Sequence, residues 1–224
     1  MGIDFLTYTK SIGSIAVDMD KFDAEEISHN SLYMPDADAA ARAAEYLSKC
    51  IENQNSAGGI CECLVTGLPV GLGEPVFDKL DANLGKAVMS IGAVKGFEIG
   101  DGFAVAESTG LDNNDAFIID KNPINSCKNI SKKTNHSGGV LGGMSDGSPL
   151  VFRAAFKPTP SIASTQHTVN RSGEEIEISI HGRHDPIIVP RAVVVVESMA
   201  AITILDLLLS NMTARLDRII DFYK

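Results

Sequence analysis

The loop at 181–186, with the sequence His-Gly-Arg-His-Asp-Pro, gathers the most side chains that could do chemistry, and Arg191 follows shortly after it. A guanidinium can bind phosphate or carboxylate through two parallel hydrogen bonds, which makes Arg183 a candidate anion ligand. Asp185 stands two residues further on, and a carboxylate beside a guanidinium stays ionised and able to accept a proton. The loop therefore predicts an anion site with a base beside it.

Two other interpretations of this loop stay open. His181, His184 and Asp185 could ligate a metal ion, as in a metal-dependent hydrolase. The charge of the adjacent Arg183 opposes a cation, and no second carboxylate stands close by in the sequence. Ordinary salt bridges in a polar surface loop would explain the same residues without any ligand.

A glycine-rich cluster runs from His136 to Gly147, with five glycines in its last ten residues. Glycine weakens both strands and helices, so such a segment makes sense where positive φ angles are needed, or where the backbone must approach a flat or anionic group. Its spacing matches neither the GxGxxG dinucleotide fingerprint nor the GK[ST] of a phosphate-binding loop. A pair of tight turns without a ligand is the alternative.

The segment from Lys157 to Ser161, with the sequence Lys-Pro-Thr-Pro-Ser, is stiffened by two prolines that fix φ and restrict the residues before them. A lysine at the end of a strand, followed by rigid hydroxyl residues, suits the edge of an anion or a cofactor. A simple strand terminator would account for the segment equally well.

Strands and helices must position these three segments. Apolar patterning predicts strands or extended segments at 3–8, 12–17, 59–66, 93–99, 103–106, 150–156 and 174–180. Helical spacing predicts helices at 39–51, 74–88, 190–209 and 212–223, the first of them capped by Asp36 or Asp38. The polar stretch 111–133 predicts a long surface loop. Consecutive strands mixed with helices favour an α+β layered fold, with residues 1–224 as a single domain.

The overall composition excludes several classes of protein. The net charge is −10 and the pI about 4.9, so the summed field repels phosphate, and we expect no nucleic acid and no anionic membrane as partner. Four cysteines with neither disulfide nor zinc spacing are expected to be structural thiols. The apolar run 192–210 contains Glu197 and Asp206, which predicts a buried helix rather than a membrane span. The N-terminus does not resemble a signal peptide, and we expect a cytoplasmic protein.

Five phrases of the sequence, taken in order, resemble one family. They are Gly73-Glu-Pro-Val-Phe-Asp-Lys-Leu-Asp81, the phrase from Met89 to Phe103, Asn135-His-Ser-Gly-Gly-Val-Leu-Gly-Gly-Met-Ser145, Phe156-Lys-Pro-Thr-Pro160 and Gly182-Arg-His-Asp-Pro186. Together they make the chain similar to the chorismate synthases over nearly its whole length. The match is to the C-terminal part of the family. The N-terminal phrases that carry the family's two acid histidines and its Arg-Ser-Ser flavin segment do not occur in this sequence.

This resemblance implies a fold, a reaction and a cofactor. The fold would be a β-α-β sandwich, truncated at its N-terminus, and the subunit would belong to a homotetramer. The family's reaction is the 1,4-elimination of phosphate from 5-enolpyruvylshikimate 3-phosphate, which gives chorismate in the shikimate pathway of aromatic amino acid biosynthesis. It requires reduced FMN without net redox change, and the family is associated with NADP.

The resemblance also implies roles for individual residues. Gly142 would lie at the flavin, and Arg183 would contact both the flavin and the substrate phosphate. Asp185 would draw a proton from flavin N5. Gly92 and Ala93 would reach the flavin of a neighbouring subunit, with only a backbone contact expected at Gly92. The segment that lines the flavin would consist of Lys157, Pro158, Thr159, Pro160 and Ser161.

The absent N-terminal phrases leave the activity of this chain open. One hypothesis is a chorismate synthase that acts on a small anionic substrate and needs the missing N-terminal half, for which a separately encoded chain is a candidate partner. We expect the isolated chain to be inactive. The alternative is a non-catalytic flavin-binding or assembly remnant of the same fold, and the metal-dependent hydrolase is the least favoured hypothesis.

Overall fold

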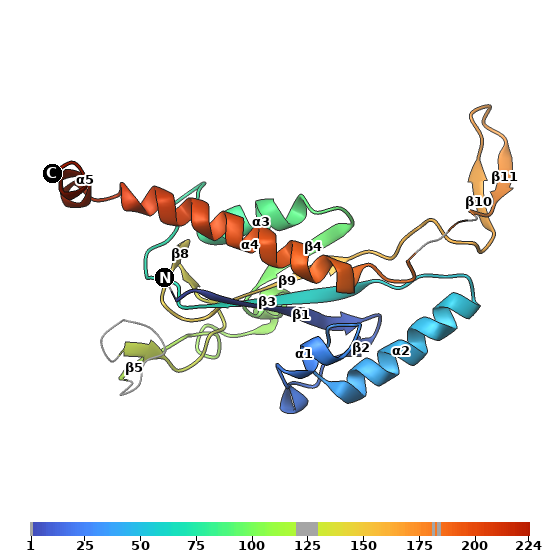
Figure 1. Cartoon of the computed structure of the whole chain (residues 1–224), viewed down its shortest axis with the longest axis horizontal. Coiled ribbons are helices and arrows are strands. Elements are labelled where there is room, and N and C mark those ends of the chain that lie inside the picture. The colour runs from blue at the N-terminus through green and yellow to red at the C-terminus, as the bar shows by residue number, and fades with distance from the viewer. Residues whose placement is uncertain (1, 120–129, 181, 183–184) are drawn as a thin grey trace. The chain divides into compact units, whose positions relative to one another are not determined.

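The computed structural model describes residues 2–119, 130–180, 182 and 185–224 (Figure 1). The chain forms two compact units. Unit 1 contains Met1–Thr7, Glu62–Ala154 and Val194–Lys224, and unit 2 contains Tyr8–Cys61 and Ala155–Val193. The boundary falls inside three strands and one long helix, so neither unit is a continuous stretch of sequence. A single domain over 1–224 stays a prediction.

The described residues contain a five-stranded sheet, three small hairpins and several helices (Figure 1). The sheet has the order β2-β1-β3-β9-β4 and consists of β1 (Asp4–Ile12), β2 (Ile15–Ala16), β3 (Gly59–Thr66), β4 (Val94–Ile99) and β9 (Leu150–Phe156). The antiparallel hairpins pair β5 (Phe117–Ile119) with β6 (Ile130–Lys132), β7 (Val140–Leu141) with β8 (Met144–Ser145), and β10 (Gln166–Val169) with β11 (Glu175–Ile178). The α-helices are α1 (Glu26–His29), α2 (Ala37–Glu52), α3 (Leu80–Met89), α4 (Val189–Met212) and α5 (Leu216–Phe222). The predicted α+β class is confirmed.

Strand β9 shows why this sequence forms the sheet. Its side chains alternate between buried and half-buried positions, and the buried set is Leu150, Phe152, Ala154 and Phe156. This two-residue period is that of a strand with one face in the core. Within unit 1 the ring of Phe152 packs against that of Phe97, with centroids 5.7 Å apart. The predicted strand at 150–156 is confirmed.

Helix α2 begins at a buried cap in unit 2. Asp36 is 2% exposed, and its carboxylate accepts hydrogen bonds from the backbone N–H groups of Asp38 and Ala39. Burial by itself would raise the pKa of Asp36, but these donors and the N–H of Asp18 outweigh burial and lower that pKa. The helix buries one face at helical spacing, formed by Ala39, Ala40, Ala43, Leu47 and Cys50. Both the predicted helix and the Asp36 cap are confirmed.

Four predictions about local structure are wrong. The strand expected at 12–17 is divided by a turn at Gly13 and Ser14, which separates β1 from β2. The helix expected at 74–88 begins only at Leu80, because Val76 has a φ of 74° in the left-handed region and cannot start a right-handed helix. Residues 103–106 lie in a 3-10 helix (Gly102–Glu107) and not in a strand. The stretch 111–133, expected to be a loop, contains the paired strands β5 and β6.

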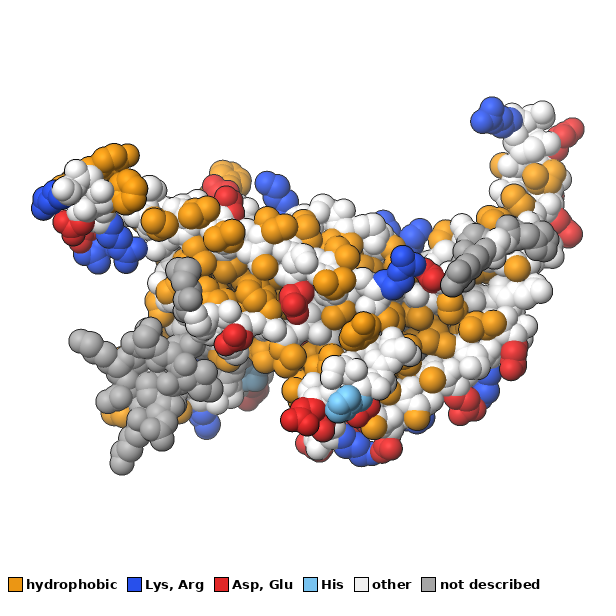
Figure 2. Space-filling view, in the orientation of Figure 1, with side chains coloured by type: hydrophobic (Ala, Val, Ile, Leu, Met, Phe, Trp, Pro, Cys, Tyr) orange, Lys and Arg blue, Asp and Glu red, His pale blue; other side chains and the backbone are white. Residues whose placement is uncertain are grey.

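Helix α4 is the one helix among the described residues that is long and apolar enough to cross a membrane, by length and composition alone. Its most apolar window has a mean hydropathy of 2.2, and 28% of that window is buried. Figure 2 shows hydrophobic side chains gathered along the side of α4 that faces the viewer. The expectation of a buried helix therefore holds for one face of α4 only.

The cysteines of the described residues are buried thiols. Cys50, Cys61 and Cys63 are all buried, and Cys127 lies outside the described residues. Burial raises the pKa of Cys63 to about 12. A thiol with such a pKa stays protonated at neutral pH, which fits the predicted structural role.

Candidate functional site

The glycine-rich cluster lies in unit 1, on the β7–β8 hairpin and the turns on either side of it. Every glycine of the cluster has a positive φ, namely Gly138 at 63°, Gly139 at 83°, Gly142 at 62°, Gly143 at 88° and Gly147 at 92°. Residues with a Cβ rarely adopt this left-handed backbone, so the whole cluster depends on glycine. The prediction that this segment needs positive φ angles is confirmed.

Gly142 differs from its neighbours in what surrounds it. A Cβ added at Gly138 would lie 2.3 Å from the backbone nitrogen of Gly100, and one added at Gly139 would lie 2.6 Å from the carbonyl oxygen of Pro149. Close packing of backbone against backbone therefore accounts for these two glycines. At Gly142, by contrast, no atom lies within 4 Å of an added Cβ, and the residue is exposed. Gly142 presents bare backbone to open space, as the approach of a flat ligand requires.

The buried carboxylate of Asp115 holds the start of this cluster in place. Its Oδ1 accepts hydrogen bonds from the Thr134 hydroxyl and the His136 N–H, each at 2.8 Å. Its Oδ2 accepts from the Ser137 N–H at 2.9 Å and from the Ser137 hydroxyl at 2.7 Å. Burial by itself would raise the pKa of Asp115, but the four donors outweigh it and hold that pKa well below its usual range.

A buried lysine links Asp115 to the far end of the cluster. The side chain of Lys132 is 4% exposed, and its Nζ lies 2.5 Å from Asp146 Oδ2 and 3.7 Å from Asp115 Oδ2. The same ammonium donates to the Ser137 hydroxyl at 3.2 Å and lies 5.8 Å from the centre of the Phe117 ring. This network was not predicted, because 111–133 was expected to be a surface loop and its partners are far apart in the sequence.

His136 joins the cluster to the turn after β4. Its Nδ1 lies 2.6 Å from Asp101 Oδ2, and its carbonyl oxygen accepts from the Asp101 N–H at 2.9 Å. Asn135 makes two further hydrogen bonds at this end of the cluster. Its Oδ1 accepts from the Gly139 N–H and its Nδ2 donates to the Pro149 carbonyl, both at 2.8 Å. The cluster is therefore held rigidly by side chains of unit 1.

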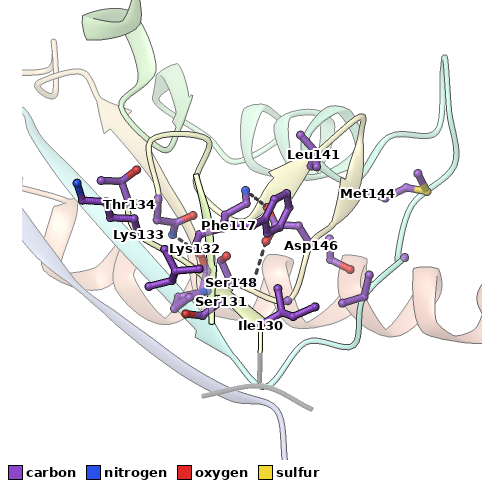
Figure 3. A pocket seen from close by; sticks show the side chains of 17 residues that line it. Phe117, Ile130, Ser131, Lys132, Lys133, Thr134, Leu141, Met144, Asp146 and Ser148 are labelled. Atoms are coloured by element: carbon purple, nitrogen blue, oxygen red, sulfur yellow. Dashed lines mark hydrogen bonds and ion pairs between the residues drawn. The ribbon is translucent and has the colours of Figure 1, made fainter. Parts of the chain in front are cut away.

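A cavity of about 720 Å³ opens beside the cluster in unit 1 (Figure 3). Its apolar wall consists of Val70, Phe117, Ile118, Ile130, Leu141 and Met144. Lys132 and Asp146 lie at its edge and are paired with each other. The cavity borders Leu141, the residue before Gly142, so the open backbone lies at its margin.

Gly92 and Ala93 form the turn between α3 and β4. Gly92 is exposed, and no atom lies within 4 Å of a Cβ added there. Ala93 has a φ of 70°, which is strained for a residue with a Cβ. Like Gly142, this turn presents accessible backbone, which agrees with an expected contact through the main chain at Gly92.

The segment from Lys157 to Ser161 follows β9 in unit 2. Its carbonyls are anchored: that of Thr159 accepts from the Ser56 hydroxyl at 2.7 Å, and that of Pro160 accepts from Gln166 Nε2 at 3.0 Å. Lys157 is exposed. Anchored carbonyls and an outward-facing cation fit the prediction of a rigid edge for an anion or a cofactor.

Asp185 forms an ion pair with Arg191, whose Nη1 donates to Asp185 Oδ2. Their side chains are 44% and 76% exposed, so the pair lies at the surface of unit 2. The predicted neighbour Arg183 lies outside the described residues, as do His181 and His184. Among the residues that the structure does describe, no group of three His, Cys, Asp or Glu side chains could hold a metal ion.

The predicted site residues are divided between the two units. Gly92, Ala93 and Gly142 lie in unit 1, whereas Lys157 to Ser161 and Asp185 lie in unit 2. Gly92 and Gly142 present open backbone in unit 1, and Lys157 and Asp185 carry charged side chains in unit 2. The convergence of the two groups on one ligand stays a prediction.

Comparison with known proteins identifies the family. The family model described as Chorismate synthase matches residues 1–209. This chain belongs to the chorismate synthase family. The chorismate synthase of Agathobacter rectalis is 70% identical over 224 residues, which are 100% of this chain and 59% of that protein. The chorismate synthase of Lachnoclostridium phytofermentans is 58% identical over 224 residues, 100% of this chain and 60% of that protein.

A chorismate synthase crystal structure has the same fold. It matches with a TM-score of 0.76 at 28% sequence identity, over 95% of this chain and 59% of the solved chain. The resemblance stated from the five phrases is confirmed. The chain spans about three fifths of the length of these chorismate synthases and corresponds to their C-terminal portion.

Proposed function

We propose that this chain forms the C-terminal part of a chorismate synthase, which eliminates phosphate from 5-enolpyruvylshikimate 3-phosphate with the help of reduced FMN. The observation that carries the proposal is the open, exposed backbone at Gly142, inside a cluster whose other groups are fixed by buried charges. Membership of the family, with a relative 70% identical, supports the reaction.

The residues present fit a flavin. A planar ring can lie against main chain only where no Cβ intervenes, and Gly142 and Gly92 both leave open space at that position. The exposed ammonium of Lys157 stands on a segment anchored by its carbonyls, and suits the phosphate of a mononucleotide. Gly142 would contact the flavin ring and Lys157 the phosphate of FMN, whereas Gly92 would contact the flavin of a neighbouring subunit.

The chain's own side chains would bind and place the reacting groups. Reduced FMN, when bound, would supply the electron-rich centre that allows phosphate to leave without net redox change. Arg183 would bind the leaving phosphate of the substrate through charge-assisted hydrogen bonds. Asp185 would accept a proton at its carboxylate, whose orientation is set by the hydrogen bond from Arg191. Placement and electrostatics would thus be the contribution of this part of the protein.

Several properties of the whole enzyme belong to the same proposal. The substrate is a small anionic molecule, and the working form is a cytoplasmic homotetramer in which Gly92 and Ala93 reach the flavin of a neighbouring subunit. The family's association with NADP belongs to the same proposal. The remaining two fifths of the family's length, carried by the same polypeptide or by a separately encoded one, complete the active site.

Flavin titration tests the proposal. The chain is titrated with FMN alone, and again when mixed with the segment of the Agathobacter rectalis protein that this chain does not match. We expect FMN to bind the mixture, and Gly142→Ala to weaken that binding. The matched control is Gly173→Ala, because Gly173 also has a positive φ, of 82°, and no atom within 4 Å of an added Cβ. Absence of FMN binding with and without the added segment would contradict the proposal.

The individual roles have separate tests in the complemented enzyme. Asp185→Ala should reduce turnover more than flavin affinity. Arg183→Ala should weaken phosphate binding, by about 1.5–3 kcal/mol for a lost charge-assisted contact. Equal loss of flavin affinity in both variants would show that the two roles are misassigned.

A non-catalytic flavin-binding or assembly remnant is the second candidate. It is motivated by the absence from this sequence of the phrases that carry the family's two acid histidines. A mixture that binds FMN but forms no chorismate from 5-enolpyruvylshikimate 3-phosphate would support the remnant. Formation of chorismate by the mixture supports the enzyme, and turnover by the isolated chain would refute the expectation that it is inactive.

A further inference from the structure

One turn of unit 2 contacts both charged segments of the candidate site. It consists of residues 56–58, which lie between the end of α2 and the start of β3, and we call it the connecting turn. The segment from Lys157 to Ser161 and the loop that carries Asp185 belong to the same unit. The contacts that join the three are therefore internal to one compact unit.

The first contact is made by the side chain of Ser56. Its hydroxyl donates to the carbonyl of Thr159 at 2.7 Å, although the two residues are 103 positions apart in the sequence. Both residues are half-buried, which protects the hydrogen bond from competition by water. Because Thr159 is the middle residue of its segment, this bond fixes the main chain between Lys157 and Ser161.

The second contact holds the loop that carries Asp185. The Ala57 N–H donates to the carbonyl of Pro186 at 2.8 Å, and Ala57 itself is 4% exposed. Pro186 follows Asp185 directly, and the Asp185 carboxylate accepts a hydrogen bond from Arg191. The carboxylate therefore stands one residue from a buried anchor on the connecting turn.

Gly58 fixes the position of the connecting turn itself. Its carbonyl accepts from the N–H of Gly13, the residue after β1, at 2.8 Å. A Cβ added at Gly58 would lie 2.6 Å from the carbonyl oxygen of Phe156 and 3.1 Å from Cδ of Pro158. The φ of Gly58 is not in the left-handed region, so lack of space alone requires glycine there. The turn is therefore packed tightly between β1 and the start of the Lys157 segment.

We infer that Ser56 is a positioning residue for the proposed flavin site. Its hydrogen bond to Thr159 holds the segment from which Lys157 contacts the phosphate of FMN, on the same turn that anchors the loop of Asp185. A lysine side chain is long and flexible, so it binds an anion at a defined place only when its main chain is fixed. The two prolines stiffen the segment from within, and Ser56 fixes its centre to the rest of unit 2. The inference rests on the proposed function, in which Lys157 contacts that phosphate.

A purely structural role for Ser56 makes a different prediction. If the hydroxyl only stabilises unit 2, its loss affects FMN binding to the same extent whether or not residue 157 is a lysine. If Ser56 acts through Lys157, the effects of the two substitutions are not additive, because the second removes the group that the first misplaces. The coupling between the two positions therefore distinguishes the two roles.

A double-mutant cycle on FMN affinity measures this coupling. The chain is mixed with the segment of the Agathobacter rectalis chorismate synthase that it does not match, and FMN binding is followed by flavin fluorescence. Ser56→Ala should weaken FMN binding about threefold to tenfold, as expected for one lost neutral hydrogen bond. Ser56→Thr, which keeps a hydroxyl, should retain most of the affinity. In a chain that carries Lys157→Ala, adding Ser56→Ala should change the affinity by less than about twofold.

Ser179→Ala is the matched control. Ser179 is also half-buried in unit 2, and its hydroxyl donates to the backbone carbonyl of Ala163 at 2.6 Å. The variant therefore loses the same kind of hydrogen bond close to the same segment. It should leave FMN affinity within about twofold of that of the unaltered chain.

The possible results separate the inference from the proposed function. If Ser56→Ala binds FMN as tightly as the unaltered chain, or loses as much affinity with Lys157→Ala as without it, the inference is overturned and the proposed function stands. If Ser179→Ala weakens binding as much as Ser56→Ala, the effect is one of general packing, which also overturns the inference. If the unaltered mixture does not bind FMN, the proposed function fails and the inference fails with it.

Discussion

Replacing Asp115 with Asn should loosen the glycine-rich cluster, because no orientation of an amide can match the four donors that the carboxylate now accepts. Two of these donors are the backbone N–H groups of His136 and Ser137, one on each carboxylate oxygen. Whichever way the new amide turns, one backbone N–H faces an NH₂ group. A buried donor without an acceptor costs about 1–3 kcal/mol.

The loss of charge adds to this cost. The remaining hydrogen bonds become neutral and fall from about 1.5–3 to about 0.5–1.5 kcal/mol each. Lys132 keeps Asp146 at 2.5 Å but loses its second carboxylate at 3.7 Å. Together these effects predict that Asp115→Asn lowers the local stability of the cluster by about 3–5 kcal/mol.

Hydrogen exchange followed by mass spectrometry measures this local stability directly. A loss of about 3 kcal/mol makes exchange in peptides covering 134–147 roughly a hundredfold faster, at about 1.4 kcal/mol per factor of ten. Asp112→Asn is the control, because Asp112 lies in the same segment but is exposed, and such substitutions stay within about 0.5 kcal/mol. If exchange in Asp115→Asn matches that in Asp112→Asn, the carboxylate does not hold the cluster.

The same carboxylate predicts a dependence on pH. Its pKa is lower in the folded chain than in the unfolded chain, so its contribution is fully present above the unfolded value, near pH 4. The contribution is lost as the pH falls through the depressed folded value. Unaltered chain should therefore lose stability below about pH 4 more steeply than Asp115→Asn, as measured by urea unfolding at a series of pH values.

Two further predictions concern the glycines and the thiols. Gly139→Ala should lower the free energy of urea unfolding several times more than Gly142→Ala. The new Cβ at position 139 meets a carbonyl oxygen at 2.6 Å, whereas the one at position 142 meets open space and costs only about 1–2 kcal/mol for left-handed backbone. Equal losses in the two variants would contradict this difference in packing. Cys63 should resist alkylation by iodoacetamide at pH 8 until the chain is unfolded, because burial raises its pKa to about 12; labelling of native chain at the rate of an exposed thiol would contradict this.

The strands and helices that were predicted correctly are those whose pattern of buried side chains lies within their own residues. Strand β9 and helix α2 carry the periodicity of their buried faces within one short stretch, and Asp36 caps its helix through donors two and three residues away. The same reasoning failed at Val76, where the apolar spacing predicted a helix but the left-handed φ prevents one from starting.

The features of the candidate site also divide into those that the sequence predicts and those that it does not. Positive φ angles were readable from the glycines themselves, and the rigid edge at Lys157 was readable from its prolines. The ion network could not be read, because Asp115 and Lys132 are 17 positions apart in a polar stretch without periodicity. Neither could the pairing of Asp185 with Arg191, since Arg183 and Arg191 both stand near Asp185 in the sequence.

The outer edge of the sheet at β1 has a consequence for how copies of this protein can associate. Its neighbour β2 is only two residues long and pairs Ser11 with Ala16 and Ile12 with Ile15. Beyond that pairing, irregular main chain takes over: the Thr9 N–H donates to the Tyr33 carbonyl at 2.9 Å, and the Lys10 carbonyl accepts from the Val17 N–H at 3.0 Å. The main-chain groups along this stretch of β1 are therefore already bonded, so a strand of a second molecule cannot pair with the sheet there.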